Sequence, residues 1–379
     1  MRLSELMEGL DYLVLQCSAE AVVADVAYDS RKVRPGFAFV CVVGTSRDSH
    51  DYAGDVAAAG ASVLVIQHKL DEMPAGVTVV QVENSRDALA IMSCNLFGNP
   101  SRKMTMIGVT GTKGKTTTAH MIRAAMLAAG KKCGIIGTNG TAFAGEQHAL
   151  VNTTPESYEL QKLFSEMLAA GCDSVVMEVS SQGLMMGRVD GIHFDVGVFT
   201  NLYPDHIGGP GEHQSFEEYR AWKGQLFRRC DVGVVNADDK NCNTLLAGHT
   251  CRLVRYAMHK DADFMGRDLR LERGENFLGI SYQLTGVWNA RVKVNMPGEF
   301  SVYNSLAALA VGHVLGLPLE AVCRGLEQVS VKGRVELVPV SKRFTVLIDF
   351  AHNEAGTENL LTTLRAYGRK RLVVLFGCG

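Results

Sequence analysis

Short apolar runs alternate with amphipathic stretches through the first hundred residues. Apolar runs of four to eight residues bounded by turn formers are typical of buried strands, and a 3.6-residue period is typical of helices. The alternation predicts a small α/β domain over residues 1–100, ending where Gly98 and Pro100 break the pattern. The expected strands are 38–43, 62–66 and 78–82, and the expected helices are 52–60 and 85–97.

The same alternation continues to a second break at 331–335. Apolar strands separated by helices usually form parallel sheets that are covered on both faces, so residues 101–333 are expected to be a central, mostly parallel domain. Its expected strands are 104–110, 133–136, 174–179, 194–200 and 232–236, and its first helix is 116–129.

A third α/β unit is expected to begin at residue 334. It has strand-like runs at 344–350 and 372–376 around a helical pattern at 354–367. The stretch 334–379 is much shorter than the roughly 100 residues that an independent α/β domain usually needs, so we expect this third domain to be incomplete.

The composition excludes several classes of protein. The 379 residues are 47% hydrophobic and 21% charged, which is ordinary for a globular chain, and the formal charge of -2 provides no general attraction for nucleic acid. No run approaches the 18 to 20 apolar residues that span a bilayer, so we expect a cytoplasmic protein without membrane insertion. The ten cysteines form no C-x-x-C pair and are expected to be reduced.

The strongest chemical signal lies between the strand at 104–110 and the following helix. Backbone N–H groups at such a turn, together with the helix N-terminus, bind phosphates. Lys115 would reach the terminal phosphates and Thr116 would ligate magnesium, although Val109 replaces the first glycine of the usual spacing. The loop residues are Gly111, Thr112, Lys113, Gly114, Lys115, Thr116 and Thr117.

Three separated residues are candidate metal ligands. Glu178 and His206 stand at or after the ends of apolar strands, where a parallel sheet gathers ligand-binding groups, and Lys223 lies on a later helix. Taken alone each signal is weak. A polar residue that closes a strand is often a cap, and a lysine on an amphipathic helix is usually solvated.

Together these motifs resemble the Mur ligases, the ATP-dependent amide ligases that build the peptidoglycan peptide. The resemblance is most specific for the MurE branch, the UDP-N-acetylmuramoyl-tripeptide synthetases, and covers nearly the whole chain. It implies a three-domain α/β architecture with a central P-loop parallel-sheet domain and a Rossmann-like third domain. The motifs that carry it are 29–31 with Pro35 and Gly36, 111–116, 153–155, 178–181, Asn201 with Asp205 and His206, Pro297, Gly298 and Asn304, 333–336 and 349–353.

The resemblance implies a role for each matching residue in nucleotide binding. Lys115 and Thr116 match residues that bind ATP and Mg²⁺, and Glu178 and His206 match ligands of a second Mg²⁺. Lys223 matches a carbamylated lysine, whose positive charge is replaced by an anionic oxygen ligand. Contacts to adenine, to the ATP phosphates and to ribose are implied, in that order, for Asn304, Arg334 and Asp349.

The resemblance also implies a substrate site that spans the first two domains. Small hydroxyl side chains match the contacts to uridine diphosphate, although local turn capping explains two of them equally well. Arg188 would bind a carboxylate with its guanidinium. The chain departs from the family at Gln182 and Met186 and in an insertion at 208–213. The implied substrate contacts are Ser30, Thr45, Ser46, Thr153, Thr154, Ser180 and Arg188.

The activity implied is the addition of a diamino acid, meso-diaminopimelate or L-lysine, to UDP-MurNAc-L-Ala-D-Glu through an acyl phosphate, by a monomer. The chain as written is expected to bind nucleotide and the uridine-linked substrate weakly and to turn over poorly or not at all, because its third domain is incomplete. Two alternatives remain. The chain could be another Mur-like ligase, of the folylpolyglutamate or cyanophycin synthetase type, or a catalytically impaired nucleotide-binding remnant.

Overall fold

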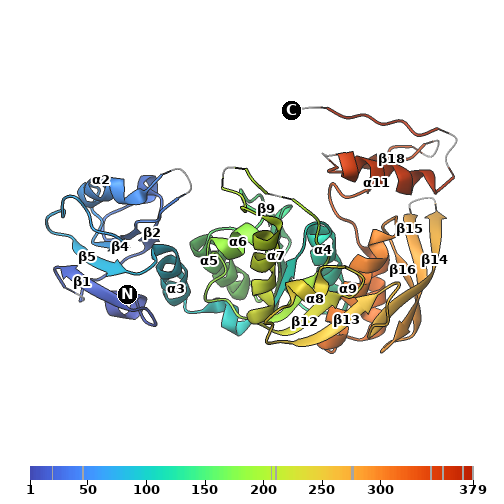
Figure 1. Ribbon diagram of the computed structural model, residues 1–379, viewed down its shortest axis with the longest axis horizontal. Coiled ribbons are helices and arrows are strands. Elements are labelled where there is room, and N and C mark those ends of the chain that lie inside the picture. Colours follow the sequence, from blue (N-terminus) through green and yellow to red (C-terminus); the bar gives the residue numbers. More distant parts are fainter. Residues whose placement is uncertain are drawn as a thin grey trace.

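The structure is a computed structural model that describes residues 1–18, 20–44, 47–205, 207–209, 211–274, 277–341, 344–351, 354–368 and 371–377. Its strands form three sheets, which follow one another in chain order along the molecule (Figure 1). No helix among the described residues has the length and the apolar composition that a bilayer crossing requires.

The first sheet has the strand order β1-β5-β4-β3-β2, and only the β1–β5 pair is antiparallel. Successive side chains of β4 alternate between its two faces: Val65 packs in the cluster with α1 and α3, and Leu64 packs in the cluster with α2. The expected α/β unit is thus confirmed. Its elements are α1 (Leu3–Leu6), β1 (Tyr12–Gln16), β2 (Val26–Ala27), β3 (Ala38–Val40), α2 (Ala53–Ala58), β4 (Val63–Ile66), β5 (Thr78–Val82) and α3 (Ser85–Leu96), with 3-10 turns at Ser30–Lys32 and Ser49–Tyr52.

The second sheet contains 11 strands among the described residues, in the order β16-β15-β14-β13-β12-β11-β6-β10-β7-β8-β9. The strands from β14 to β7 run parallel, as expected for a mostly parallel domain, although β13 and β14 were not among the expected strands. The parallel strands are β6 (Thr105–Thr110), β7 (Cys133–Gly137), β10 (Ser174–Glu178), β11 (Phe194–Phe199), β12 (Cys230–Asn236), β13 (Arg252–Ala257) and β14 (Phe264–Gly274).

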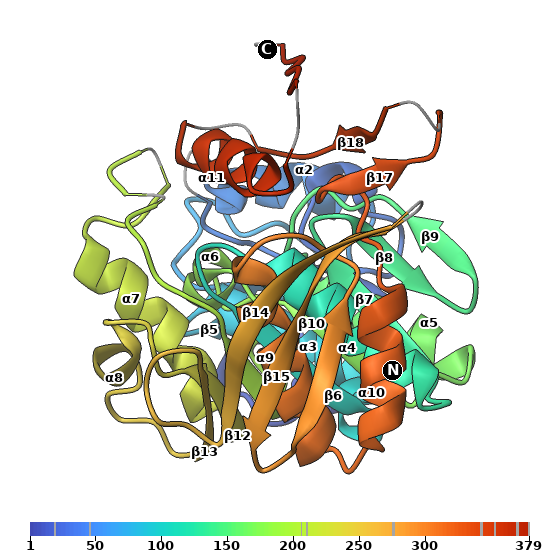
Figure 2. The ribbon, with the colours of Figure 1, turned by 90° about the vertical axis from the view of Figure 1, so that its right-hand side faces the viewer.

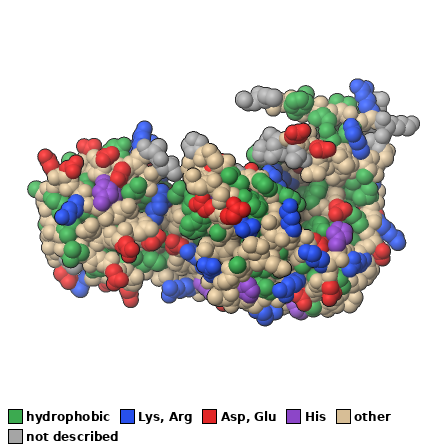
Figure 3. Space-filling view, in the orientation of Figure 1, with side chains coloured by type: hydrophobic (Ala, Val, Ile, Leu, Met, Phe, Trp, Pro, Cys, Tyr) green, Lys and Arg blue, Asp and Glu red, His purple; other side chains and the backbone are tan. Residues whose placement is uncertain are grey.

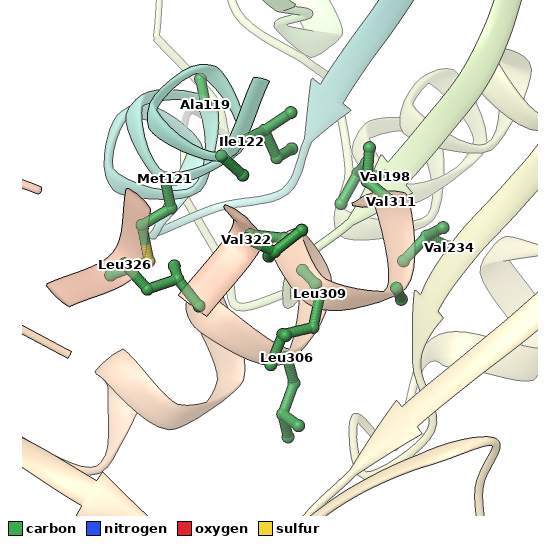
Figure 4. Packing of buried hydrophobic residues seen from close by; sticks show 14 of the residues in the cluster. Ala119, Met121, Ile122, Val198, Val234, Leu306, Leu309, Val311, Val322 and Leu326 are labelled. Atoms are coloured by element: carbon green, nitrogen blue, oxygen red, sulfur yellow. The ribbon is translucent and has the colours of Figure 1, made fainter. Parts of the chain in front are cut away.

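Helices cover both faces of this sheet. On one face α4 packs over β6, β7 and β10, α9 packs beside it over β12, β13 and β14, and α10 packs against both helices. Val198, Val234 and Leu309 belong to the apolar cluster of this layer (Figure 4). Each such fully buried side chain contributes about 1.5–3 kcal/mol by leaving water. The helices of this face are α4 (Lys115–Ala128), α9 (Phe300–Val314) and α10 (Leu319–Gln328), and those of the other are α5 (Ser157–Ala169), α6 (Ser181–Met185), α7 (Phe216–Gly224) and α8 (Cys242–Leu245).

Antiparallel strands extend the second sheet at both edges, and the apolar pattern did not predict them. The neighbouring strand β14 carries charged residues at positions 267, 268, 270, 272 and 273, so it does not read as a continuous apolar run. The extensions are β15 (Phe277–Gly286) and β16 (Ala290–Val294) at one edge, and β8 (Gly140–Phe143) and β9 (Glu146–His148) at the other.

The third sheet is a two-stranded antiparallel pair, β17 (Glu336–Val338) with β18 (Val346–Ile348), followed by α11 (Glu354–Arg365). This unit lies over the ends of β14 and β15, where Tyr367 donates to the carbonyl of Gly279 (2.6 Å; Figure 2). The prediction of a strand at 372–376 is wrong. Residues 371–377 form no ladder, and Leu375 is 99% exposed. A strand needs a paired neighbour to satisfy its backbone groups, and apolar composition alone does not provide one.

Candidate active site

The turn between β6 and α4 has the geometry of a phosphate-binding loop. Gly111 and Gly114 adopt φ of +145° and +85°, which L side chains rarely tolerate. A Cβ on Gly111 would lie 1.9 Å from Oγ1 of Thr200, and one on Gly114 would lie 2.7 Å from Oδ1 of Asn304. The two glycines therefore let the loop pass close to neighbouring side chains while α4 begins at Lys115.

Residues directly after β11 form hydrogen bonds with the backbone of the phosphate-binding loop. Asn201 accepts the N–H of Lys113 at its Oδ1 (2.9 Å), and Thr200 Oγ1 donates to the Lys113 carbonyl (2.7 Å). The Thr112 hydroxyl lies 3.1 Å from that of Tyr219 on α7. No pattern in the sequence assigns these supporting residues a role, because hydrogen bonds between distant segments leave no periodic signal.

Lys115 lies inside the loop rather than on its surface. Its Nζ donates to the carbonyls of Gly111 (2.9 Å) and Thr112 (3.0 Å). Burial lowers the pKa of Lys115, and the carboxylate of Glu178 opposes that shift. The amine is thus close to where terminal phosphates would bind.

Lys223 donates to the same Gly111 carbonyl as Lys115 does. It is 2% exposed, its Nζ donates to Gly111 O (3.0 Å), and the amine lies 4.6 Å from the centroid of the Tyr219 ring. The solvated alternative for this lysine is therefore wrong. Burial first, and the charge of Lys115 second, hold the pKa of Lys223 well below its usual value. A buried, neutral amine can react with carbon dioxide.

The other proposed metal ligands supply oxygen. Glu178, at the end of β10, is 1% exposed, and its carboxylate accepts from the N–H (2.8 Å) and the hydroxyl (3.3 Å) of Thr138. Thr116 is 5% exposed at the start of α4. His206 lies outside the described residues, and its neighbour Asp205 pairs with Lys113 (3.4 Å). A carboxylate and a hydroxyl are hard ligands that fit Mg²⁺, whereas Lys223 fits it only as a carbamate.

The remaining residues that were expected to bind the nucleotide lie on α9 and at the start of the third unit. Asn304 is 5% exposed on α9 and accepts the Thr118 hydroxyl (3.2 Å) directly behind Gly114. Arg334 stacks on Phe350 (4.9 Å), and its charge contributes to the lowered pKa of Lys115. The carboxylate of Asp349 accepts hydrogen bonds from the backbone N–H groups of Val335 and Ala351, with N···O distances of 2.8 Å. In the described structure Asp349 therefore orders the start of the third unit.

The predicted substrate residues of the central unit form a connected network. The Thr154 hydroxyl donates to the Glu178 carbonyl (3.0 Å) and approaches Ser180 Oγ (3.1 Å), which caps α6. Thr153 contacts Thr138 through hydroxyls 3.0 Å apart. Through Glu178 this network reaches the phosphate loop.

Arg188 lies at a cavity of about 320 Å³ between the first and central units. Its terminal nitrogens bind Glu156 (2.8 Å) and the Thr154 carbonyl (3.1 Å), and its buried Nε has no hydrogen-bond partner among the described residues. The surface is notched between these two units (Figure 3). The lining residues are Tyr28, Val42, Gly44, Arg47, Ser49, Arg86, Leu89, Glu156, Met186 and Arg188, of which the sequence analysis assigned only Arg188 to substrate.

The predicted uridine residues are only partly described. Ser30 begins the 3-10 turn after β2 and is not among the cavity-lining residues, while Thr45 and Ser46 lie outside the described residues. In the described residues that follow, the carboxylate of Asp48 contacts the rings of His50 (2.5 Å) and His68 (2.8 Å).

Asp48, His50 and His68 are close enough together to resemble a metal site. However, His50 Nε2 accepts the N–H of Gln67 (3.0 Å), so the ring proton is on Nδ1, which donates to Asp48. A metal on Nδ1 would require either an imidazolate or a clash with that N–H. We therefore assign these residues to fixing the turn at 48–50.

Two features that the sequence analysis expected to depart from the family contact each other. Gln182, on α6, donates through its side-chain amide to the carbonyl of Gly211, within the expected insertion at 208–213 (3.2 Å).

Comparison with known proteins agrees with this geometry. The family model of the Mur ligase middle domain matches residues 109–312, and that of the Mur ligase glutamate ligase domain matches residues 333–379. A UDP-N-acetylmuramoyl-L-alanyl-D-glutamate--2,6-diaminopimelate ligase of Clostridium perfringens is 38% identical over 100% of this chain and 78% of its own. The enzyme of the same name from Caldanaerobacter subterraneus is 36% identical over 100% of this chain and 77% of its own.

Solved structures show the same fold. A structure of a diaminopimelate ligase of that name has a TM-score of 0.81 and 22% identity over 100% of this chain and 77% of its own. A folylpolyglutamate synthase of Mycobacterium tuberculosis, solved with ADP and AMPPCP, has a TM-score of 0.60 and 22% identity over 74% of this chain and 70% of its own. From its phosphate loop, its sheet order and these matches, the chain belongs to the Mur ligase family.

Proposed function

We propose that this protein uses ATP to join meso-diaminopimelate to UDP-MurNAc-L-Ala-D-Glu in peptidoglycan synthesis. The observation that carries the proposal is the convergence of Lys115 and Lys223 on the Gly111 carbonyl, with Glu178 close enough to affect Lys115. The diaminopimelate ligases that match the whole chain support the choice of substrates. Lysine remains the alternative acceptor.

The reaction requires activation of a carboxylate. A carboxylate is a poor electrophile, so phosphoryl transfer from ATP must first make an acyl phosphate, which the incoming amine then attacks with release of phosphate. Lys115 would neutralise charge on the transferred phosphoryl group, and the backbone N–H groups of the loop would orient it. No covalent enzyme nucleophile is required.

We propose that Thr116, Glu178, His206 and carbamylated Lys223 hold Mg²⁺. The metal would supply charge neutralisation between the phosphate and carboxylate oxygens. The burial of Glu178 and Lys223 supports this role, because a buried carboxylate and carbamate interact strongly with a cation. Asn304, Arg334 and Asp349 are proposed to contact the nucleotide, together with the loop residues.

We propose that the uridine-linked substrate lies across the cavity between the first and central units. Ser30, Thr45 and Ser46 would hold its uridine end, and Thr153, Thr154 and Ser180 its peptide end. The guanidinium of Arg188, held at its terminal nitrogens by Glu156 and the Thr154 carbonyl beside this cavity, supports binding of an anionic group there.

The chain is further proposed to divide into domains 1–100, 101–333 and 334–379 and to act as a monomer. A ligase that consumes ATP is expected to work in the cytoplasm.

The folylpolyglutamate alternative is less well supported. The folylpolyglutamate synthase structure covers 74% of the chain, whereas the diaminopimelate ligase structure covers all of it, including the first sheet. The remnant alternative conflicts with the intact loop and the buried Lys223 and Glu178.

Phosphate release tests the proposal and its alternatives. The protein expressed from its complete reading frame is incubated with ATP, Mg²⁺ and UDP-MurNAc-L-Ala-D-Glu, with diaminopimelate or lysine, and in parallel with folate and glutamate. We expect release that depends on both the uridine substrate and diaminopimelate. Release with folate, or ATP binding without turnover in any mixture, would contradict the proposal.

A further inference from the structure

A chain of three charged side chains crosses from the first unit to the central unit beside the cavity. Glu156, directly before α5, binds Arg188 through Oε1 (2.8 Å) and approaches Arg86 of α3 through Oε2 (3.5 Å). All three residues line the cavity, and the sequence analysis assigned no function to Glu156 or Arg86.

These side chains are largely buried. Their exposed fractions are 17% for Glu156 and Arg188 and 21% for Arg86, so solvent screens their attraction only partly. Burial lowers the pKa of Arg86 and the charge of Glu156 opposes the shift. Loss of the carboxylate would leave two guanidinium groups close together without a counterion.

Glu156 also determines how Arg188 is oriented. The planar guanidinium is held at one terminal nitrogen by Glu156 and at the other by the Thr154 carbonyl (3.1 Å), which leaves Nε without an acceptor. Because the donors of arginine form a rigid fork, holding two nitrogens fixes the direction of the third.

We propose that Glu156 is a positioning residue for substrate binding: it orients Arg188 toward an anionic oxygen of the uridine-linked substrate, and Arg86 holds Glu156 from the first unit. This inference rests on the proposed function. It goes beyond that function because it gives a role to two residues that would not contact the reacting atoms.

The competing explanation is that Glu156 merely joins the two units. Glu159, one turn further along α5, provides a matched control. It accepts from the Tyr28 hydroxyl (2.8 Å) and approaches Lys32 (3.8 Å), so it also bridges to the first unit, but none of its hydrogen bonds or ion pairs involves Arg188. A purely structural role predicts similar effects from neutralising either glutamate.

The test uses steady-state kinetics on the protein expressed from its complete reading frame. The variants are Glu156→Gln, Glu156→Asp, Arg86→Met, Glu159→Gln, Arg188→Met and Glu156→Gln combined with Arg188→Met. For Glu156→Gln we expect KM for UDP-MurNAc-L-Ala-D-Glu to rise about tenfold, while kcat and the KM for ATP stay within about twofold. Arg86→Met should raise the same KM by about threefold, and Glu156→Asp should fall between wild type and Glu156→Gln.

The double variant gives the decisive comparison. If Glu156 acts through Arg188, adding Glu156→Gln to Arg188→Met should change KM by less than about twofold. Full additivity, an unchanged KM in Glu156→Gln, or an equal effect of Glu159→Gln would overturn the inference. If Glu156→Gln does not fold, as judged by melting and ATP binding, Glu156→Asp and Arg86→Met carry the test. Wild-type protein that releases no phosphate with this substrate would refute the proposed function itself, and the inference with it.

Discussion

At the scale of single residues, Lys115 illustrates how burial changes a prediction made from sequence. The phosphate-loop pattern indicates what the lysine does but not that its amine already has two carbonyl partners. The sequence could not reveal this because those contacts depend on φ angles at Gly111 and Gly114 that only the folded loop fixes.

Lys115→Ala should weaken ATP binding by roughly 100-fold, since a charge-assisted hydrogen bond to a buried phosphate contributes about 1.5–3 kcal/mol. The fold should survive, because the side chain lies outside the apolar clusters. Calorimetric titration with ATP measures the effect. Lys131→Ala, an exposed lysine just after α4, is the control, and unchanged ATP affinity in Lys115→Ala would contradict the assignment.

For Lys223, the residue type alone leads to a wrong prediction of its exposure. An amphipathic helix predicts a solvated lysine, whereas the structure buries this side chain against Tyr219 and Gly111. Only the family resemblance singled it out, because nothing in the local sequence distinguishes a buried lysine from a surface one.

Lys223→Ala should lose most ligase activity and recover part of it when formate or acetate is added, because a short carboxylate can replace the oxygen atoms of a carbamate. The measurement is phosphate release across a carboxylate concentration series. Lys115→Ala should gain nothing from the same additives. Full activity of Lys223→Ala without them would contradict carbamylation.

At the scale of elements, the sequence predicted what is periodic and missed what is irregular. Parallel strands and their covering helices follow from apolar runs and from helical spacing, so β6, α4, β10 and β11 were placed within one or two residues. The 372–376 run was misassigned because strand propensity does not include the pairing partner. The turn at 48–50 and the segment 200–203 depend on side-chain hydrogen bonds, which no pattern predicts.

The turn at 48–50 should show a pH-dependent contribution to stability. Burial opposes ionisation of Asp48, but hydrogen bonds from His50 and His68 outweigh it and lower its pKa to about 2. The hydrogen bond to Asp48 raises the pKa of His68 above 6.5. The carboxylate therefore stabilises the fold above pH 3.8 and loses this effect as pH falls through about 2, whereas charged His68 adds stability below 6.5 that is lost as pH rises through its raised pKa.

The free energy of unfolding of Asp48→Asn, measured with urea, should therefore fall further below that of wild type near pH 5 than near pH 8.5. The half-exposed His68 will limit the size of this difference. Asp51→Asn, on the same 3-10 turn, is the control. An equal gap between wild type and Asp48→Asn at both pH values would contradict the assignment.

At the scale of the whole molecule, the sequence predicted the order of the units but not how they contact each other. The first and central units are joined by side chains that look ordinary in the sequence: Tyr158 donates to Asp25 (3.1 Å), and Tyr28 donates to Glu159 (2.8 Å). Such contacts join residues more than 130 positions apart. The cavity is lined by residues of both units, so its lining could not be read from local sequence.

Removing both hydroxyls in Tyr28→Phe with Tyr158→Phe should loosen this junction without unfolding either unit. Each hydroxyl bonds a carboxylate, an interaction worth about 1.5–3 kcal/mol, while the rings that pack against Phe97 and the first core remain. We expect faster amide exchange at the start of α5 and a higher KM for the uridine-linked substrate, because that substrate must bridge both units. ATP affinity should stay unchanged, since the phosphate loop belongs to the central unit alone.

Tyr282→Phe is the matched control for the double variant. It removes a hydroxyl bonded to Ser305 inside the central core (2.8 Å), so it should lower the melting temperature without changing amide exchange at α5. Unchanged exchange at α5 in the double variant would mean that these two hydroxyls do not determine how the units are joined.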